Sequence, residues 1–201
     1  MGVETLVTKR TLIILGHPAS DSFCGFLVNR YAEGAKEGGS EVKIIRLSEL
    51  SFNPILNQGY RNTQDLEPDL VAAQQDILWA EHLVLVYPLW WGAMPALLKG
   101  FIDRVFLPQF AFRYRKNSVL WDKLLAGRSA HVLVTMDTPP WYFRWVYRMP
   151  GHHQIKQTIL EFSGIKPVKI FSFGPIRGSS EHKRKSWAEK ARRLGLYSSR
   201  G

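Results

Sequence analysis

The chain has 201 residues, of which 45% are hydrophobic and 22% charged, and this balance excludes a disordered protein. Its net charge is +10, its single cysteine excludes an internal disulfide, and no apolar run reaches the ~20 residues that span a bilayer. We therefore expect one domain over residues 1–201, with a core at about 10–196, located in the cytoplasm and without a transmembrane segment.

Five short apolar runs have the composition of β-strands, and they alternate with segments of helical periodicity. In chain order, the predicted strands are residues 11–15, 42–46, 83–87, 131–135 and 168–172. The predicted helices are residues 23–37, 69–79, 95–106, 154–162 and 180–196. The first and third strands are continuously apolar, which is typical of central strands that are covered on both faces.

This alternation predicts an α/β fold, a three-layer sandwich around a five-stranded parallel sheet in the order 2-1-3-4-5. Three long connections are expected to be irregular, and loops of that length are usually functional or interfacial: residues 51–68, 107–127 and 136–151. Ligands of such sheets bind beyond the carboxyl ends of the strands. The loops after strands one, three and four are therefore the candidate site.

The densest positive charge lies in the last predicted helix, which includes the run of residues 182–185. In that helix Trp187, Ala191 and Leu194 recur at helical spacing, so the basic residues are interpreted as its solvated face. A nucleic-acid-binding face is the alternative. That alternative explains none of the loop features below, and no nucleic-acid partner is predicted.

The loop after strand one runs from Gly16 directly into the first helix. Ser20, Asp21 and Ser22 are good N-cap residues, and a helix start offers free N–H groups and a positive dipole end. The loop is therefore suited to a phosphate, although an ordinary capped helix is the alternative. The G-x-G-x-x-G and G-x-x-x-x-G-K-[ST] patterns are missing, which argues against Rossmann and P-loop proteins.

The loop after strand three carries two adjacent tryptophans, Trp90 and Trp91. Pro88 sets the turn before them, and Gly92 permits close backbone approach after them. Two exposed indoles at a strand end favour a flat ligand, whereas a plug for the end of the sheet is the alternative.

Residues 88–104 read Pro-Leu-Trp-Trp-Gly-x-Met-Pro-Ala-x-Leu-Lys-Gly-Phe-x-Asp-Arg, which resembles the signature of the NAD(P)H:quinone reductase (DT-diaphorase) family. Residues 52–54 also match that family, and the resemblance continues to about residue 176. It implies a flavodoxin-like fold and a two-electron, ping-pong reduction of quinones or similar flat acceptors by a flavoprotein oxidoreductase. It also implies a homodimer, FMN (alternatively FAD) as cofactor, and NAD(P)H as hydride donor.

The cofactor-binding residues that the resemblance implies follow strands one, three and four: His17, Ser22, Phe23, Pro88, Leu89, Trp90, Trp91, Gly92, Thr135 and Asp137. The first three are expected near the flavin phosphate, and the residues at 88–92 along the flavin ring. The turn after strand four departs from the Thr-Thr-Gly-Gly of mammalian members, because it keeps Thr135 but lacks the glycines.

For catalysis, the resemblance implies a Tyr and a His six positions apart, a spacing that Tyr147 and His153 share. Tyr142 and His152 are the alternatives in the same segment.

Residues 141–147 contain five aromatics, which predicts either a lid over a planar substrate or a dimer contact. No metal is predicted, because the paired histidines at 152–153 lack acidic or Cys partners at ligand spacing. The alternative function is a flavin-binding regulatory subunit, for example of a potassium efflux system.

Overall fold

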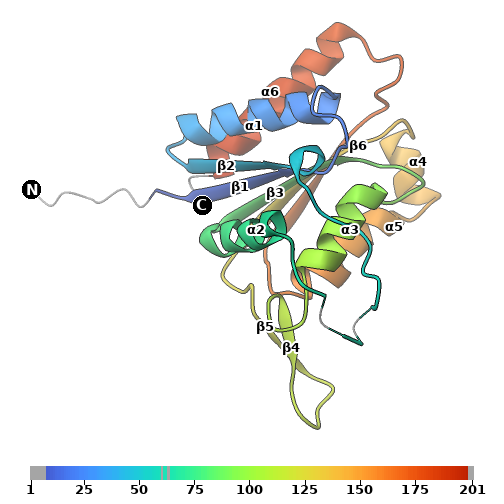
Figure 1. Cartoon of the computed structure of the whole chain (residues 1–201). Helices are drawn as coiled ribbons and strands as arrows, with labels where there is room; N and C mark the ends of the chain where they lie inside the picture. The colour runs from blue at the N-terminus through green and yellow to red at the C-terminus, as the bar shows by residue number, and fades with distance from the viewer. Residues whose placement is uncertain (1–7, 60, 63, 199–201) are drawn as a thin grey trace, which may run out of the picture.

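The structure is a computed structural model that describes residues 8–59, 61–62 and 64–198. Its centre is a five-stranded parallel sheet (Figure 1). Across the sheet the strands are β2 (Glu41–Arg46), β1 (Arg10–Leu15), β3 (His82–Pro88), β6 (Ser129–Thr135) and β7 (Val168–Phe173). This arrangement confirms the predicted order 2-1-3-4-5 and the α/β class.

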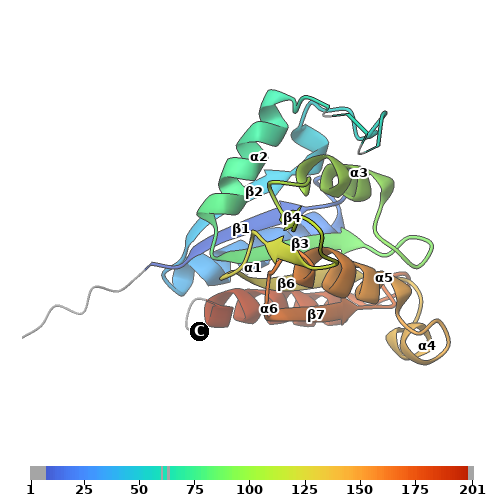
Figure 2. The same ribbon diagram turned by 90° about the horizontal axis from the view of Figure 1, so that it is seen from below.

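Helices cover both faces of the sheet, as Figure 2 shows from below. On one face lie α1 (Phe23–Glu37) and α6 (Glu181–Ser198). On the other lie α2 (Pro68–Trp79), α3 (Ala96–Val105), and α5 (Pro150–His153) with the π-helix η2 (Gln154–Glu161) that continues it. A single 3-10 turn, η1 (Leu47–Glu49), follows β2.

The alternation of side chains along each strand produces two hydrophobic cores. On β1, Ile13 and Leu15 pack toward α1 and α6, whereas Leu12 and Ile14 pack toward the helices of the opposite face. All seven residues of β3 are buried. This pattern explains why the central strands read as continuous apolar runs.

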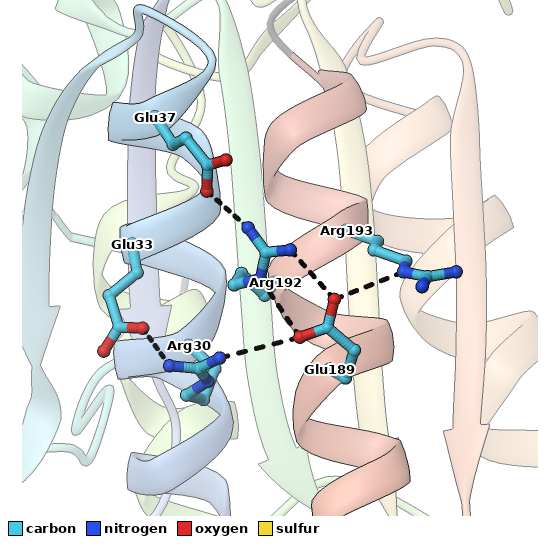
Figure 3. Close-up of polar contacts among 6 residues, drawn as sticks. All are labelled: Arg30, Glu33, Glu37, Glu189, Arg192 and Arg193. Atoms are coloured by element: carbon cyan, nitrogen blue, oxygen red, sulfur yellow. Dashed lines mark hydrogen bonds and ion pairs between the residues drawn. The ribbon is translucent and has the colours of Figure 1, made fainter.

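The helices α1 and α6 approach each other so closely that only glycine fits at the contact. A Cβ added at Gly34 would lie 1.8 Å from the carbonyl oxygen of Arg192, and one at Gly195 would lie 2.1 Å from the carbonyl oxygen of Tyr31. Beside this contact, Glu189 binds Arg192 at 2.9 Å and Arg193 at 3.2 Å (Figure 3). Together we call these glycines and ion pairs the α1–α6 clasp.

Arginines and glutamates extend the clasp across both helices. The guanidinium of Arg192 also binds Glu37 of α1, and Arg30 of α1 lies 3.7 Å from Glu189 of α6 while binding Glu33 of its own helix (Figure 3). Of the basic residues of α6, Arg192 and Arg193 are engaged in these ion pairs, and Lys185 binds Glu181 within the helix.

Two connections that were predicted to be irregular contain regular structure. Residues 107–127 include a hairpin of β4 (Phe112–Tyr114) and β5 (Trp121–Lys123), and residues 136–151 include α4 (Pro140–Trp145) and the start of α5. Among the described residues, no helix is both long and apolar enough to cross a bilayer.

Candidate active site

The three loops that the sequence singled out meet beyond the carboxyl ends of β1, β3 and β6. They enclose a cavity of about 250 Å³, which we call the carboxyl-edge cavity. Eight of the ten predicted cofactor-binding residues line it: His17, Ser22, Phe23, Pro88, Leu89, Trp90, Thr135 and Asp137. The other two, Trp91 and Gly92, line an adjoining cavity of about 490 Å³, which we call the lid cavity.

The start of α1 gathers hydrogen-bond donors at one end of the carboxyl-edge cavity. The side chain of Ser22 caps the helix by accepting a bond from the N–H of Gly25 at 3.3 Å. In the part of the chain that the structure describes, no protein group accepts from the N–H groups of Phe23 or Cys24. These two donors are therefore available to an anion.

The imidazole of His17 adds a third donor beside them. Its Nδ1 accepts a hydrogen bond from the N–H of Ala19 at 2.9 Å, so the neutral ring carries its proton on Nε2. The loop lies tightly against the helix at Gly25, since a Cβ at this position would lie only 1.9 Å from the carbonyl oxygen of Ser20. Together these donors could hold an anionic group such as a phosphate.

The loop after β3 forms a tight turn with Trp91 and Gly92 at its tip. The N–H of Trp90 donates to the carbonyl of Ala93 at 2.9 Å, and the N–H of Ala93 donates back at 3.0 Å. Both tip residues have positive φ, 51° for Trp91 and 78° for Gly92, as in the primed turns of hairpins. Such a conformation strains a tryptophan, by ~1 kcal/mol or more.

This turn presents both an aromatic face and backbone donors to the cavities. The indole of Trp91 is fully exposed, and that of Trp90 is half-exposed. Within the described chain, the N–H groups of Trp91 and Gly92 have no protein acceptor. The interpretation of the tryptophans as a plug is not supported for Trp91, because its side chain is not packed into the protein.

The aromatic segment 141–147 borders the lid cavity. Tyr147 lines it together with Phe143, and the ring of Tyr142 meets that of Tyr147 edge-on at 5.1 Å. Arg148 and Met149, which follow, both have left-handed backbone conformations and turn the chain into α5. The first turn of α5 then packs on the loop, because a Cβ at Gly151 would lie 2.4 Å from the carbonyl oxygen of Gly92.

The two adjacent histidines of α5 differ in environment. His153 is exposed and lines neither cavity. His152 is buried, and its Nε2 lies 2.9 Å from Oγ of Ser172. Burial, helped by the charge of His153, lowers the pKa of His152 to about 4, so its imidazole is neutral at physiological pH.

The thiol of Cys24 lies in the wall of the carboxyl-edge cavity, with Sγ 3.2 Å from Oγ1 of Thr135. Burial raises the pKa of Cys24 to about 11, against a smaller opposing effect of the bond to Thr135. The side chain is a neutral thiol, which suits packing rather than nucleophilic chemistry.

Sequence reasoning missed the contribution of the loop after β7. Ile176 from that loop lines the carboxyl-edge cavity, and its N–H donates to the carbonyl of Met136 at 3.0 Å. Next to it, the N–H of Arg177 donates to the carboxylate of Asp137 at 2.7 Å. The rule that ligands bind beyond strand ends applies to the fifth strand as well, and could have pointed to this loop.

Comparisons with known proteins agree with this geometry. A family model described as flavodoxin-like fold matches residues 9–196. A Haemophilus influenzae protein named an uncharacterized NAD(P)H oxidoreductase is 31% identical over 90% of this chain and 91% of its own. The rat NAD(P)H dehydrogenase (quinone) 1 is 28% identical over 84% of this chain and 71% of its own.

Solved structures show the same fold. A crystal structure from Streptococcus mutans UA159 superimposes with a TM-score of 0.80 at 28% identity, covering 93% of this chain and 98% of that one. An NAD(P)H:quinone oxidoreductase from Methanothermobacter marburgensis superimposes with a TM-score of 0.79 at 23% identity, covering 95% and 97%. The resemblance noted from residues 88–104 is thereby confirmed over the length of the chain.

Proposed function

The chain belongs to the flavodoxin-like fold family, and from this membership we propose that it is an NAD(P)H oxidoreductase that uses a bound flavin to reduce quinones or similar flat acceptors. The names of its relatives support the activity. The observation that carries the proposal is the pairing of a phosphate site at the start of α1 with the aromatic, donor-bearing turn of Trp91 and Gly92.

The residues present fit a flavin at both of its ends. The N–H groups of Phe23 and Cys24 and the Nε2–H of His17 would hold the phosphate. The Trp90–Trp91 turn would support the ring, and Thr135 and Asp137 also line the carboxyl-edge cavity. We propose FMN rather than FAD, because the described loops gather donors for one phosphate cluster.

When bound, the flavin supplies the redox chemistry, taking a hydride from NAD(P)H and passing two electrons to the acceptor. The N–H groups of Trp91 and Gly92 would stabilise negative charge at the ring edge without reorganisation, since the turn already fixes their direction. Tyr147 and Phe143 would exclude water and orient a flat substrate in the lid cavity. The role of His153 is a prediction that rests on the resemblance alone.

We also propose that the enzyme acts as a homodimer in the cytoplasm. The exposed aromatic residues of α4 support the dimer, because a monomer rarely leaves such a surface in water. The buried, free thiol of Cys24 is in keeping with a reducing compartment.

The test is the visible spectrum of the purified protein, followed by identification of the released flavin and by assays of NADH and NADPH oxidation with a benzoquinone. We expect one FMN per chain and quinone-dependent turnover. Failure of both FMN and FAD to bind on reconstitution would contradict the flavin. A bound flavin that no nicotinamide reduces would contradict the enzymatic activity while leaving the cofactor in place.

A further inference from the structure

A third cavity, of about 280 Å³, is lined by residues at the amino ends of β3, β6 and β7, the end of the sheet opposite the carboxyl-edge cavity. Its wall includes His82 at the start of β3, Ser129 and His131 on β6, and Lys169 on β7, with α6 closing one side. We call it the amino-edge cavity. We propose that it binds a small aromatic carboxylate, at a site separate from the flavin.

Four side chains, three in the wall of this cavity and the buried Tyr31 outside it, form one continuous hydrogen-bonded chain. Oγ of Ser129 lies 2.8 Å from Nδ1 of His82, and Nε2 of His82 lies 3.0 Å from the hydroxyl of Tyr31. The same hydroxyl lies 2.8 Å from Nδ1 of His131. Each hydroxyl and each neutral imidazole has one such proton to give, so the three bonds of the chain can all point in the same direction.

The direction of the chain decides what His131 presents to the cavity. In one direction, Ser129 donates to His82, His82 donates to Tyr31, and Tyr31 donates to Nδ1 of His131. The proton of His131 is then on Nε2, for which the described residues provide no acceptor. In this state the imidazole offers an N–H donor, and an anion in the cavity would select the state.

The charge of the wall also favours an anion. Lys9 and Lys169 line the cavity, and after burial their positive charge contributes to lowering the pKa of His82 and of His131, the latter to about 4. Both imidazoles are therefore neutral at pH 7, and the two ammonium groups set a positive potential. The neighbouring acid, Glu81, is not part of the wall and binds Arg10.

The wall also contains apolar side chains, which favour an anion with an organic body. Phe171 and Leu194 line the cavity, and the ring of Phe171 meets that of His131 edge-on at 5.2 Å. A fully hydrated inorganic ion would gain nothing from these surfaces, whereas a phenyl ring would bury apolar area against them. A volume of about 280 Å³ lies at the lower end of ligand pockets, which suits a single ring.

The test is a titration of the full-length purified protein with benzoate, followed by NMR of the histidine rings and by calorimetry. Benzamide serves as the neutral isostere, and inorganic phosphate as the anion without an apolar body. We expect benzoate to bind with a Kd of ~1 mM or tighter and to raise the pKa of His131. Benzamide and phosphate should bind at least about tenfold more weakly.

Variants locate the site. Lys169→Gln should weaken benzoate at least about fivefold, whereas Lys116→Gln removes a similar charge from the exposed hairpin loop and should change nothing. Benzamide binding as tightly as benzoate would overturn the proposal, as would phosphate binding equally well. Benzoate binding detected by calorimetry without a response of the His131 ring would also overturn it. None of these outcomes depends on flavin binding or on turnover.

Discussion

The imidazole of His17 meets the indole of Trp90 edge to face, with ring centroids 5.7 Å apart. This contact joins the loop after β1 to the loop after β3 across the carboxyl-edge cavity. The hydrogen-bond donors at the start of α1 and the aromatic turn are thus positioned relative to each other before a ligand binds. This preorganisation lowers the entropic cost of binding. The first predictions concern this turn.

Replacing Trp91 by alanine should weaken flavin binding about ten- to a hundredfold, equivalent to about 1.4–2.7 kcal/mol. The indole is fully exposed, so its loss should leave the unfolding midpoint of the flavin-free protein within about 2 °C of the parent. Flavin fluorescence quenching measures the first quantity and calorimetry the second. Leu78→Ala, which removes an exposed apolar side chain on α2 outside both cavities, is the control. An unchanged Kd for Trp91→Ala would refute a role for the ring.

Gly92 should tolerate alanine better than valine. A Cβ at this position would lie 3.7 Å from Cγ of Pro150, which is an ordinary contact, so the main penalty is the φ of +78°. That penalty is about 1 kcal/mol for alanine and greater for the β-branched valine. We expect Gly92→Val to lower both the flavin affinity and the stability of the flavin-free protein, with Gly92→Ala in between. Unchanged flavin affinity and stability in both variants would show that φ does not limit this turn.

Initial-rate plots with NAD(P)H and a benzoquinone should give parallel lines. The lid cavity is the open space beside the Trp91–Gly92 turn, so nicotinamide and quinone would occupy it in turn. A ping-pong pattern follows when the first product leaves before the second substrate enters. Intersecting lines would indicate a ternary complex and a second substrate position.

The sheet was predictable because its strands coincide with short apolar runs in the sequence. In the central strands β1 and β3 these runs are nearly uninterrupted. The hairpin was not, since β4 and β5 have only three residues each and are partly exposed, too short for any periodicity to register. In α4, the paired prolines 139–140 and the dense aromatics resemble a loop. The π-helix over Gln154–Glu161 was expected as a helix, but no side-chain pattern distinguishes its wider turn.

For the site, the loops after β1 and β3 were predictable because caps, prolines and glycines mark the places where a chain must turn at a strand end. The roles of individual residues around α5 were not. Tyr147 and His153 share a spacing in sequence, yet only Tyr147 lines a cavity. Which side chain points inward depends on the left-handed turn at Arg148 and Met149, and no local preference predicts that turn.

Stability should decline as the pH falls from about 6.5 toward 4. Burial lowers the pKa of His82, His131 and His152 in the folded protein, the last two to about 4, whereas an unfolded histidine titrates near 6.5. Between these values the unfolded chain binds more protons, so acid favours unfolding, and above 6.5 the effect vanishes. His131 and His152 should each lower the free energy of unfolding by about 1–2 kcal/mol between pH 7 and pH 5.

Urea unfolding at several pH values measures this dependence. His131→Gln should be less stable than the parent at pH 7, since it breaks the bond to Tyr31, and should show a shallower loss toward pH 5. His182→Gln, at the exposed start of α6, should keep the parental slope. If the free energy of unfolding of His131→Gln depends on pH as steeply as that of the parent, the protonation of this imidazole does not contribute to the pH dependence.

Light scattering at micromolar concentration should show a dimer whose interface includes residues 107–120 or 141–147. Val119 in the hairpin loop and Trp141 on α4 are both strongly exposed. At least one of Val119→Asp and Trp141→Asp should shift the protein toward monomer, because a buried, unpaired carboxylate is costly. Val71→Asp on the exposed side of α2 should have no such effect. If the unsubstituted protein is monomeric, neither segment is a dimer interface.

The α1–α6 clasp has a consequence for how the chain reaches its native state. Glu37 and Arg192, which bind each other in it, are 155 positions apart, and α6 is the last helix that the structure describes. During synthesis α1 is therefore complete long before its partner, made about 155 residues later, emerges from the ribosome. Until then Ile13, Leu15 and Leu27 have no cover from α6. A nascent or stalled chain would display this apolar face, which makes it a natural client for chaperones.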